Sequence, residues 1–226
     1  NFTNNSSVVD EKRKDSKQFK ESVYKSLTFN STPLQNAPRS RLNDCKANRN
    51  IANWQETPQS SEQLFQKAYK LFQENNFSKS LHFFQLLIQK NESHKFGFYY
   101  CGYIHLHHEK NYPSALAFLK RALKLGHAGA AHLLGTIYSQ GLGVPKNDEI
   151  ALAYFEYSAK KDHAASMLNA AILKGRCAQS DTDLCIAKEW LRKASDQGVG
   201  DIVSRKKLDA YFQVIEGLRS LKLIRS

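Results

Sequence analysis

The sequence predicts an all-α protein: a right-handed α-solenoid of stacked helix pairs that follows a disordered N-terminal arm. Apolar residues recur at helical spacing from residue 61 onward, which predicts amphipathic helices. One helix face repeats at intervals of 35 or 36 residues, a period typical of stacked helical repeats. The first 60 residues, in contrast, are polar, rich in Asn and Ser, and interrupted by proline. We therefore expect a disordered polar arm over residues 1–60, a helical repeat domain over 61–200 and a C-terminal capping helix over 201–226.

Residues 61–95 open the repeat domain with two amphipathic helices. The apolar residues of the first share one helical face, at Leu64, Ala68, Leu71 and Phe72. A polar turn at 74–76 separates them from a second set with helical spacing, at Phe77, Leu81, Phe84, Leu87 and Ile88. Because the turn is short, the two helices must pack antiparallel.

The second helix of this pair recurs three times along the chain. Its equivalent positions are Ser80, Ala115, Ala151 and Ala187, at intervals of 35, 36 and 36 residues. A large apolar residue follows each alanine by four positions, at Leu119, Phe155 and Leu191. The helices between them also align, with Gly102, Gly135 and Ala171 in one row. Since no pair can bury its apolar face alone, neighbouring pairs are expected to stack.

A glycine loop, Gly141-x-Gly143, raises the question of phosphate binding. Phosphate-binding loops follow a buried strand, whereas the segment before Gly141 is helical, and Pro145 removes a backbone donor. A structural turn accounts for more of the residues. Gly141 can end the first helix in a left-handed conformation, Gly143 allows a tight return, and Asp148 can cap the next helix. Gly135 is expected to let two helices approach closely.

These residues resemble the Sel1-like repeat family, which is related to the tetratricopeptide repeats. The family pattern is met at Ala130, Leu134, Gly135, Tyr138, Gly141, Gly143, Val144, Asp148, Ala151 and Tyr154. The match is strong over 127–163, good over 164–198 and partial over 96–126, while 61–95 look more like a plain tetratricopeptide pair. We assign repeat-structural roles to Gly102, Gly135, Tyr138, Gly141, Gly143, Asp148, Ala151 and Ala187.

The resemblance implies a non-catalytic adaptor or scaffold. Sel1-like proteins act in membrane-associated complexes, degradation machinery, chitin synthase activation, and mitochondrial assembly or stress signalling. Some secreted bacterial members are named as hydrolases, but those are rich in paired cysteines. This chain has four cysteines and no CxxC spacing, and the pairing of Cys177 with Cys185 is left open. We find no nucleophile motif and expect no enzyme activity and no cofactor.

The histidines do not predict a metal site. His105 and His108 share a helix face, but no third ligand is suitably placed except Glu109, and His105 aligns with Tyr138. His127 and His163 lie 36 residues apart in the same inter-repeat turn, so we interpret both as structural.

The first helices are expected to line a concave groove that holds a partner protein as a peptide or a helix. Tyr99 and Tyr103 are four residues apart and align with His132 and Thr136 in the next repeat. If these side chains face inward, they form a protein-binding strip, because aromatic residues dominate binding hot spots. The equal alternative is that they pack between repeats.

The net charge of +12 supports an alternative function, binding of RNA by a basic helical repeat. Part of the excess lies at Arg205, Lys206 and Lys207, in the amphipathic segment expected to cap the stack. A peripheral membrane contact is the rival role of that segment. No stretch approaches the roughly 18–20 apolar residues that span a bilayer. A chain that begins at Asn1 is expected to be a processed mature form or a fragment, and its basic charge slightly favours the mitochondrion over the cytoplasm.

Overall fold

The computed structural model describes residues 60–178 and 180–198, together with the isolated positions 210, 213 and 217. Over the two continuous ranges the regular structure consists of eight α-helices and contains no strand, which confirms the predicted all-α stack of helix pairs. The predicted arm and C-terminal capping helix fall outside the described residues, apart from Ser60 and the three isolated positions. Arg205, Lys206 and Lys207 also fall outside them.

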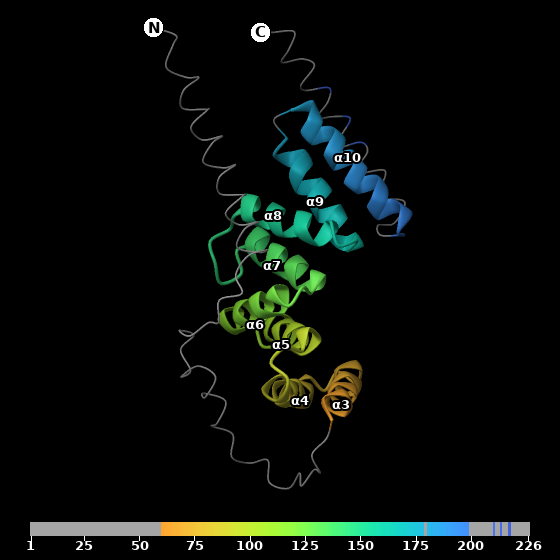
Figure 1. Ribbon diagram of the computed structural model, residues 1–226. Coiled ribbons are helices and arrows are strands. Elements are labelled where there is room, and N and C mark those ends of the chain that lie inside the picture. The colour runs from red at the N-terminus through yellow and green to blue at the C-terminus, as the bar shows by residue number, and fades with distance from the viewer. Residues whose placement is uncertain (1–59, 179, 199–209, 211–212, 214–216, 218–226) are drawn as a thin grey trace.

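The eight helices form four pairs that stack in chain order, with α3 and α4 at one end and α9 and α10 at the other (Figure 1). The first helices of the pairs are α3 (Ser61–Gln73), α5 (Lys95–His107), α7 (Ala128–Gln140) and α9 (Ala164–Arg176). The second helices are α4 (Phe77–Lys90), α6 (Tyr112–Lys124), α8 (Asp148–Ala159) and α10 (Asp181–Asp196). Each second helix packs mainly on its own partner, and α4, α6 and α8 also pack on the first helix that follows.

Short polar side chains begin the second helices. Asn76, Asn111, Asn147 and Ser180 are the N-caps, and each side chain accepts a hydrogen bond from a backbone N–H three residues on. The expectation that Asp148 caps α8 is wrong by one residue, because Asn147 has the extended backbone of a cap and Asp148 is the first helical residue. The Asp148 carboxylate remains near the positive end of the helix dipole, where a negative charge is favourable.

The repeated alanines lie at the centre of the stack. Ala115, Ala151 and Ala187 are fully buried, and so is Ser80 at the equivalent position. The Ser80 hydroxyl donates to the backbone oxygen of Ala68 on α3 at 2.8 Å, which satisfies a buried polar group. Small side chains here allow the two helices of each pair to lie close together.

The glycine row marks where the helices of a pair cross. A Cβ atom at Gly102 would lie 2.6 Å from the Leu119 side chain, and one at Gly135 would lie 2.7 Å from the Phe155 ring. Carbon atoms prefer separations of about 3.5–4.0 Å, so neither position has room for a side chain without movement of its neighbour. In the fourth pair Ala171 on α9 occupies the equivalent position and packs in a buried cluster with Leu191.

The glycine loop closes on the protein itself. Gly141 ends α7 with φ 72° and ψ 36°, in the left-handed region. The backbone N–H of Leu142 donates to Ile137 O at 3.0 Å, and that of Asn147 donates to Tyr138 O at 2.9 Å. Gly143, with φ 67°, approaches Tyr112 so closely that a Cβ would lie 2.5 Å from the Tyr112 Cβ. These donors bond to carbonyl oxygens of α7 and do not converge on an anion, while Gly143 places the turn against α6 of the preceding pair.

Candidate functional site

The four residues predicted to bind a partner are all half-buried. Tyr99 and Tyr103 lie on α5 with their ring centroids 6.3 Å apart. His132 and Thr136 lie on α7, where the Thr136 hydroxyl donates to His132 O at 3.1 Å. Tyr99 also stacks at 4.2 Å on His127, the residue that precedes α7. The row therefore takes part in packing between repeats and still keeps accessible area.

A larger aromatic surface surrounds the tyrosine end of this row. The Tyr100 ring on α5 lies 5.0 Å from Phe72, 5.6 Å from Tyr69 and 6.4 Å from Phe65, three residues of α3. Phe72 also meets Tyr103 edge-on at 5.4 Å. All five side chains are half-buried. We call these five residues the aromatic surface.

Tyr99 and Tyr100 keep their hydroxyl protons at neutral pH because their pKa values are raised. Burial, with the neighbouring Tyr69 and Tyr99 hydroxyls, raises the pKa of Tyr100 to about 12. Burial likewise raises the pKa of Tyr99. Neutral phenols combine a large apolar ring with one hydrogen-bonding group, the combination that makes tyrosine frequent at protein interfaces.

A polar hollow of about 230 Å³ lies at the other end of the row, between α7 and α9. Thr136 of the predicted row lines it from α7, and Ile172, which follows Thr136 by 36 residues, lines it from α9. The remaining lining residues are Ser139, Gln140, Asp148, Phe155, Asn169, Leu173 and Arg176. The hollow thus offers hydroxyl and amide groups beside a small apolar floor.

One carboxylate and two cations set the charge near the hollow. Asp148 Oδ2 lies 3.6 Å from a terminal nitrogen of Arg176, and Asp148 Oδ1 lies 3.8 Å from Lys146 Nζ. Asp148 Oδ1 is buried and accepts no hydrogen bond. The charge of the Asp148 carboxylate is therefore compensated by its ion pairs with Arg176 and Lys146.

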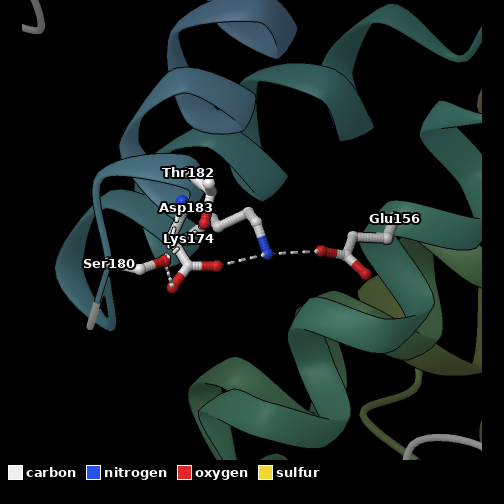
Figure 2. Close-up of polar contacts among 5 residues, drawn as sticks. All are labelled: Glu156, Lys174, Ser180, Thr182 and Asp183. Atoms are coloured by element: carbon white, nitrogen blue, oxygen red, sulfur yellow. Dashed lines mark hydrogen bonds and ion pairs between the residues drawn. The ribbon is translucent and has the colours of Figure 1, made fainter.

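Lys174 on α9 forms ion pairs with both neighbouring second helices. Its Nζ lies 3.4 Å from Glu156 Oε1 on α8 and 3.3 Å from Asp183 Oδ1 on α10 (Figure 2). Asp183 in turn accepts a hydrogen bond from the hydroxyl of Ser180, the N-cap of α10, at 2.9 Å. The Lys174 side chain is only 14% exposed, so these ion pairs join three helices in a partly desolvated place.

Several residues outside the sequence prediction contribute to these surfaces. Phe65, Tyr69 and Phe72 occur at helical spacing on α3, so the same spacing argument could have found them. Ser139 lies three residues from Thr136, and Asn169 lies three residues from Ile172, in each case about one helical turn away. The position of Asp148 beside Arg176 has no local sequence signal, because it depends on how α8 packs against α9.

The histidines examined as metal ligands have other contacts. His105 is buried, stacks on Phe118 at 5.3 Å and has its Nδ1 2.7 Å from Glu109 Oε2. His108 stacks on Phe77 at 3.4 Å. Among the described residues no group of three histidine, cysteine or carboxylate side chains is placed to hold a metal.

Cys177 and Cys185, whose pairing the sequence left open, are exposed free thiols in the structure. In the part of the chain that the structure describes, no helix has both the length and the apolar character needed to cross a bilayer.

The family model described as Sel1 repeat matches residues 98–127, 128–163 and 164–199. The chain matches no curated protein. It is similar to the crystal structure of a Sel1 repeat protein from Oxalobacter formigenes, with 21% identity and a TM-score of 0.55 over 64% of this chain and 60% of that one. It is also similar to a protective antigen with an SLR fold, present in uropathogenic Escherichia coli strains. That likeness has 18% identity and a TM-score of 0.58 over 68% of this chain and 34% of that one. At these identities the structures show a shared fold.

Proposed function

Because residues 98–199 of this chain are three Sel1 repeats, we propose that the protein is a non-catalytic scaffold that holds a partner protein on its first helices. The observation that carries this proposal is the half-buried row of Tyr99, Tyr103, His132 and Thr136. The aromatic surface lies at one end of the row and the polar hollow at the other. Aromatic anchors beside hydrogen-bonding groups are typical of protein-binding hot spots.

The charge of these helices favours a peptide or helix with apolar anchors as the ligand. Helix α7 carries no Asp, Glu, Lys or Arg, and α5 carries only Lys95. The row therefore offers rings, hydroxyls and imidazoles and few fixed charges. An amphipathic helix binds such a surface by burying its apolar face, and the polar hollow can pair with its backbone or amide groups.

Binding of RNA is the alternative function, and the net charge of +12 favours it. Recognition of a phosphate backbone requires several Lys or Arg contacts. A group of cations on α6, namely Lys120, Arg121 and Lys124, is a second-helix feature and contributes nothing to the row. The two functions would thus use different helices, and this separates them experimentally.

The experiment is affinity capture with the full chain and two matched variants. Tyr103→Ala with Thr136→Arg removes one ring and fills the hollow. Lys120→Gln with Arg121→Gln and Lys124→Gln removes the α6 cations. We choose Tyr103 over Tyr99 because Tyr99 supports His127 at the start of α7, so its removal would also disturb the joint between repeats.

We expect a protein ligand to be retained by the wild type and the glutamine variant and lost by the row variant, with far-ultraviolet circular dichroism unchanged. Removing a hot-spot side chain worth about 2 kcal/mol weakens the affinity about thirtyfold. Capture that is lost only in the glutamine variant, or after ribonuclease treatment, would instead establish RNA binding.

A further inference from the structure

From α4 to α10 the N-caps of the described helices alternate between two kinds of residue. Every second helix is capped by Asn or Ser, and α3 is capped by Ser60. The three first helices that follow, α5, α7 and α9, are preceded instead by His94, His127 and His163. Histidine is outside the group of residues preferred at this position. Its recurrence at one position in three repeats indicates a common role.

The cap histidines form hydrogen bonds through Nδ1, two of them to a backbone N–H and the third to a hydroxyl. His94 Nδ1 accepts from the backbone N–H of Gly97 at 3.1 Å, and His127 Nδ1 accepts from that of Ala130 at 3.3 Å. His163 Nδ1 lies 3.0 Å from the Ser166 hydroxyl, which is itself 2.9 Å from His132 Nδ1. Ser166 is fully buried, so this hydroxyl is shared by two imidazoles away from solvent.

Each cap imidazole also fills the joint with the preceding first helix. His94 packs on Phe65 at 5.3 Å, His127 stacks on Tyr99 at 4.2 Å, and His163 packs on His132 at 4.8 Å. One imidazole therefore lies at each of the three joints between successive first helices. Two of the residues beneath them, Tyr99 and His132, belong to the predicted binding row.

Few charged groups surround these rings. His94 lies near Glu62 of α3 and the Phe96 ring. His127 lies near Lys95 and Phe96 of α5 and, at longer range, His163. His132 faces His163 and the Phe155 ring of α8. Glu62, at the first joint, is the one carboxylate that affects the pKa of any of these four rings among the described residues, although Glu92 and Asp162 lie close to His94 and His163 in the sequence.

Protonation would reverse the cap interaction. Only a neutral imidazole with its proton on Nε2 can accept a hydrogen bond at Nδ1. At His94 and His127 a protonated cap directs an N–H at the backbone N–H that it should receive. The His163 side chain makes no hydrogen bond to a backbone N–H of α9, so protonation there acts on its contact with the Ser166 hydroxyl. At all three caps it places positive charge at the positive end of the helix dipole. Asn and Ser caps do not change charge, so the second helices keep their caps in acid.

We propose that the three cap histidines make the joints between repeats sensitive to acid: their protonation weakens the starts of α5, α7 and α9 and loosens the first-helix surface. This goes beyond the proposed function and does not rest on it, because it concerns the chain without a partner.

The direction and range of the effect follow from the burial of these rings. Burial holds the pKa of His127 and of His132 at about 4 and also lowers the pKa of His94 and of His163. The ordinary value is 6.5. Between these values the unfolded chain binds more protons than the folded chain, so stability falls as the pH falls. The stability that the neutral histidines contribute is complete above about pH 6.5 and is lost progressively toward about pH 4.

The test compares thermal unfolding at pH 7 and pH 5 for the full chain and for His94→Asn with His127→Asn and His163→Asn. Asn already caps α4, α6 and α8, so the variant keeps a cap that does not titrate. We expect the wild type to lose roughly 5 °C or more in melting temperature beyond the loss of the variant, since 1 kcal/mol shifts a domain of this size by about 2–4 °C. His82→Asn, at an exposed histidine of α4, is the control and should lose as much as the wild type.

Equal losses in the wild type and the triple variant would overturn the proposal. If the triple variant does not fold, His127→Asn alone is compared in the same way, and the imidazole signals of the native protein are titrated by NMR. Native His127 and His163 signals that titrate at the ordinary value would also overturn it. Neither measurement needs a binding partner, so a negative result here leaves the proposed scaffold function intact, and the reverse holds as well.

Discussion

Gly135 shows how the absence of one side chain sets the approach of two helices. Its position on α7 faces the Phe155 ring of α8, and a Cβ would lie 2.7 Å from that ring. We expect Gly135→Ala to destabilise the protein by about 1–2 kcal/mol, because the overpacking outweighs the better helix propensity of alanine. Urea unfolding measures this change.

The third repeat suggests the compensating substitution. There Ala171 packs in one cluster with Leu191, at the position equivalent to Phe155. Phe155→Leu alone should cost about 1 kcal/mol or more through lost packing. Combined with Gly135→Ala it should cost less than the sum, with a coupling of about 1 kcal/mol. Strictly additive effects would show that the two positions do not share space.

The ion pairs of Lys174 are significant at the scale of the element, because one side chain joins α8, α9 and α10. We expect Lys174→Met to destabilise by about 1–2 kcal/mol, between the values typical of exposed and of buried pairs. Lys193→Met is the matched control. Its pair with Glu189 lies within α10 and is exposed to solvent, so its loss should leave the free energy of unfolding nearly unchanged. Equal costs for the two lysines would refute a joining role for Lys174.

The elements themselves could be predicted because their signals are local. Helical spacing and the alanine register located every helix pair over 61–198. The start of α8 was misplaced by one residue because Asn147 and Asp148 are both capping residues, and the backbone of the turn decides between them. The common position of the cap histidines could be recognised only for His127 and His163, which are 36 residues apart. His94 precedes His127 by 33 residues, so the same repeat period does not include it.

The binding surface was harder to predict than the helices because it depends on distances across pairs. The α3 rings Phe65, Tyr69 and Phe72 lie next to Tyr100 only after α3 and α5 have been stacked. The hollow requires α7, α8 and α9 together. Helix periodicity determines which residues share a face, and it gives no measure of the space between two such faces.

At the scale of the whole molecule, the stack is close to one-dimensional. Packing joins helices of one pair or of adjacent pairs, and the buried residues form successive clusters along the chain. Leu87 belongs to the cluster at the α3–α4 end, whereas Leu191 belongs to the cluster at the α9–α10 end. In such an architecture stability is approximately a sum of repeat and neighbour contributions.

This arrangement predicts that damage at one end remains local. Leu87→Ala removes a fully buried side chain and should cost about 2–5 kcal/mol. In native-state hydrogen exchange we expect it to lower the protection of α3 and α4 strongly and to leave α9 and α10 nearly unchanged, because local openings follow cooperative units. Leu191→Ala should give the opposite pattern. If either substitution lowers protection equally along the whole stack, the protein unfolds as one cooperative unit, and contributions from single repeats cannot be separated.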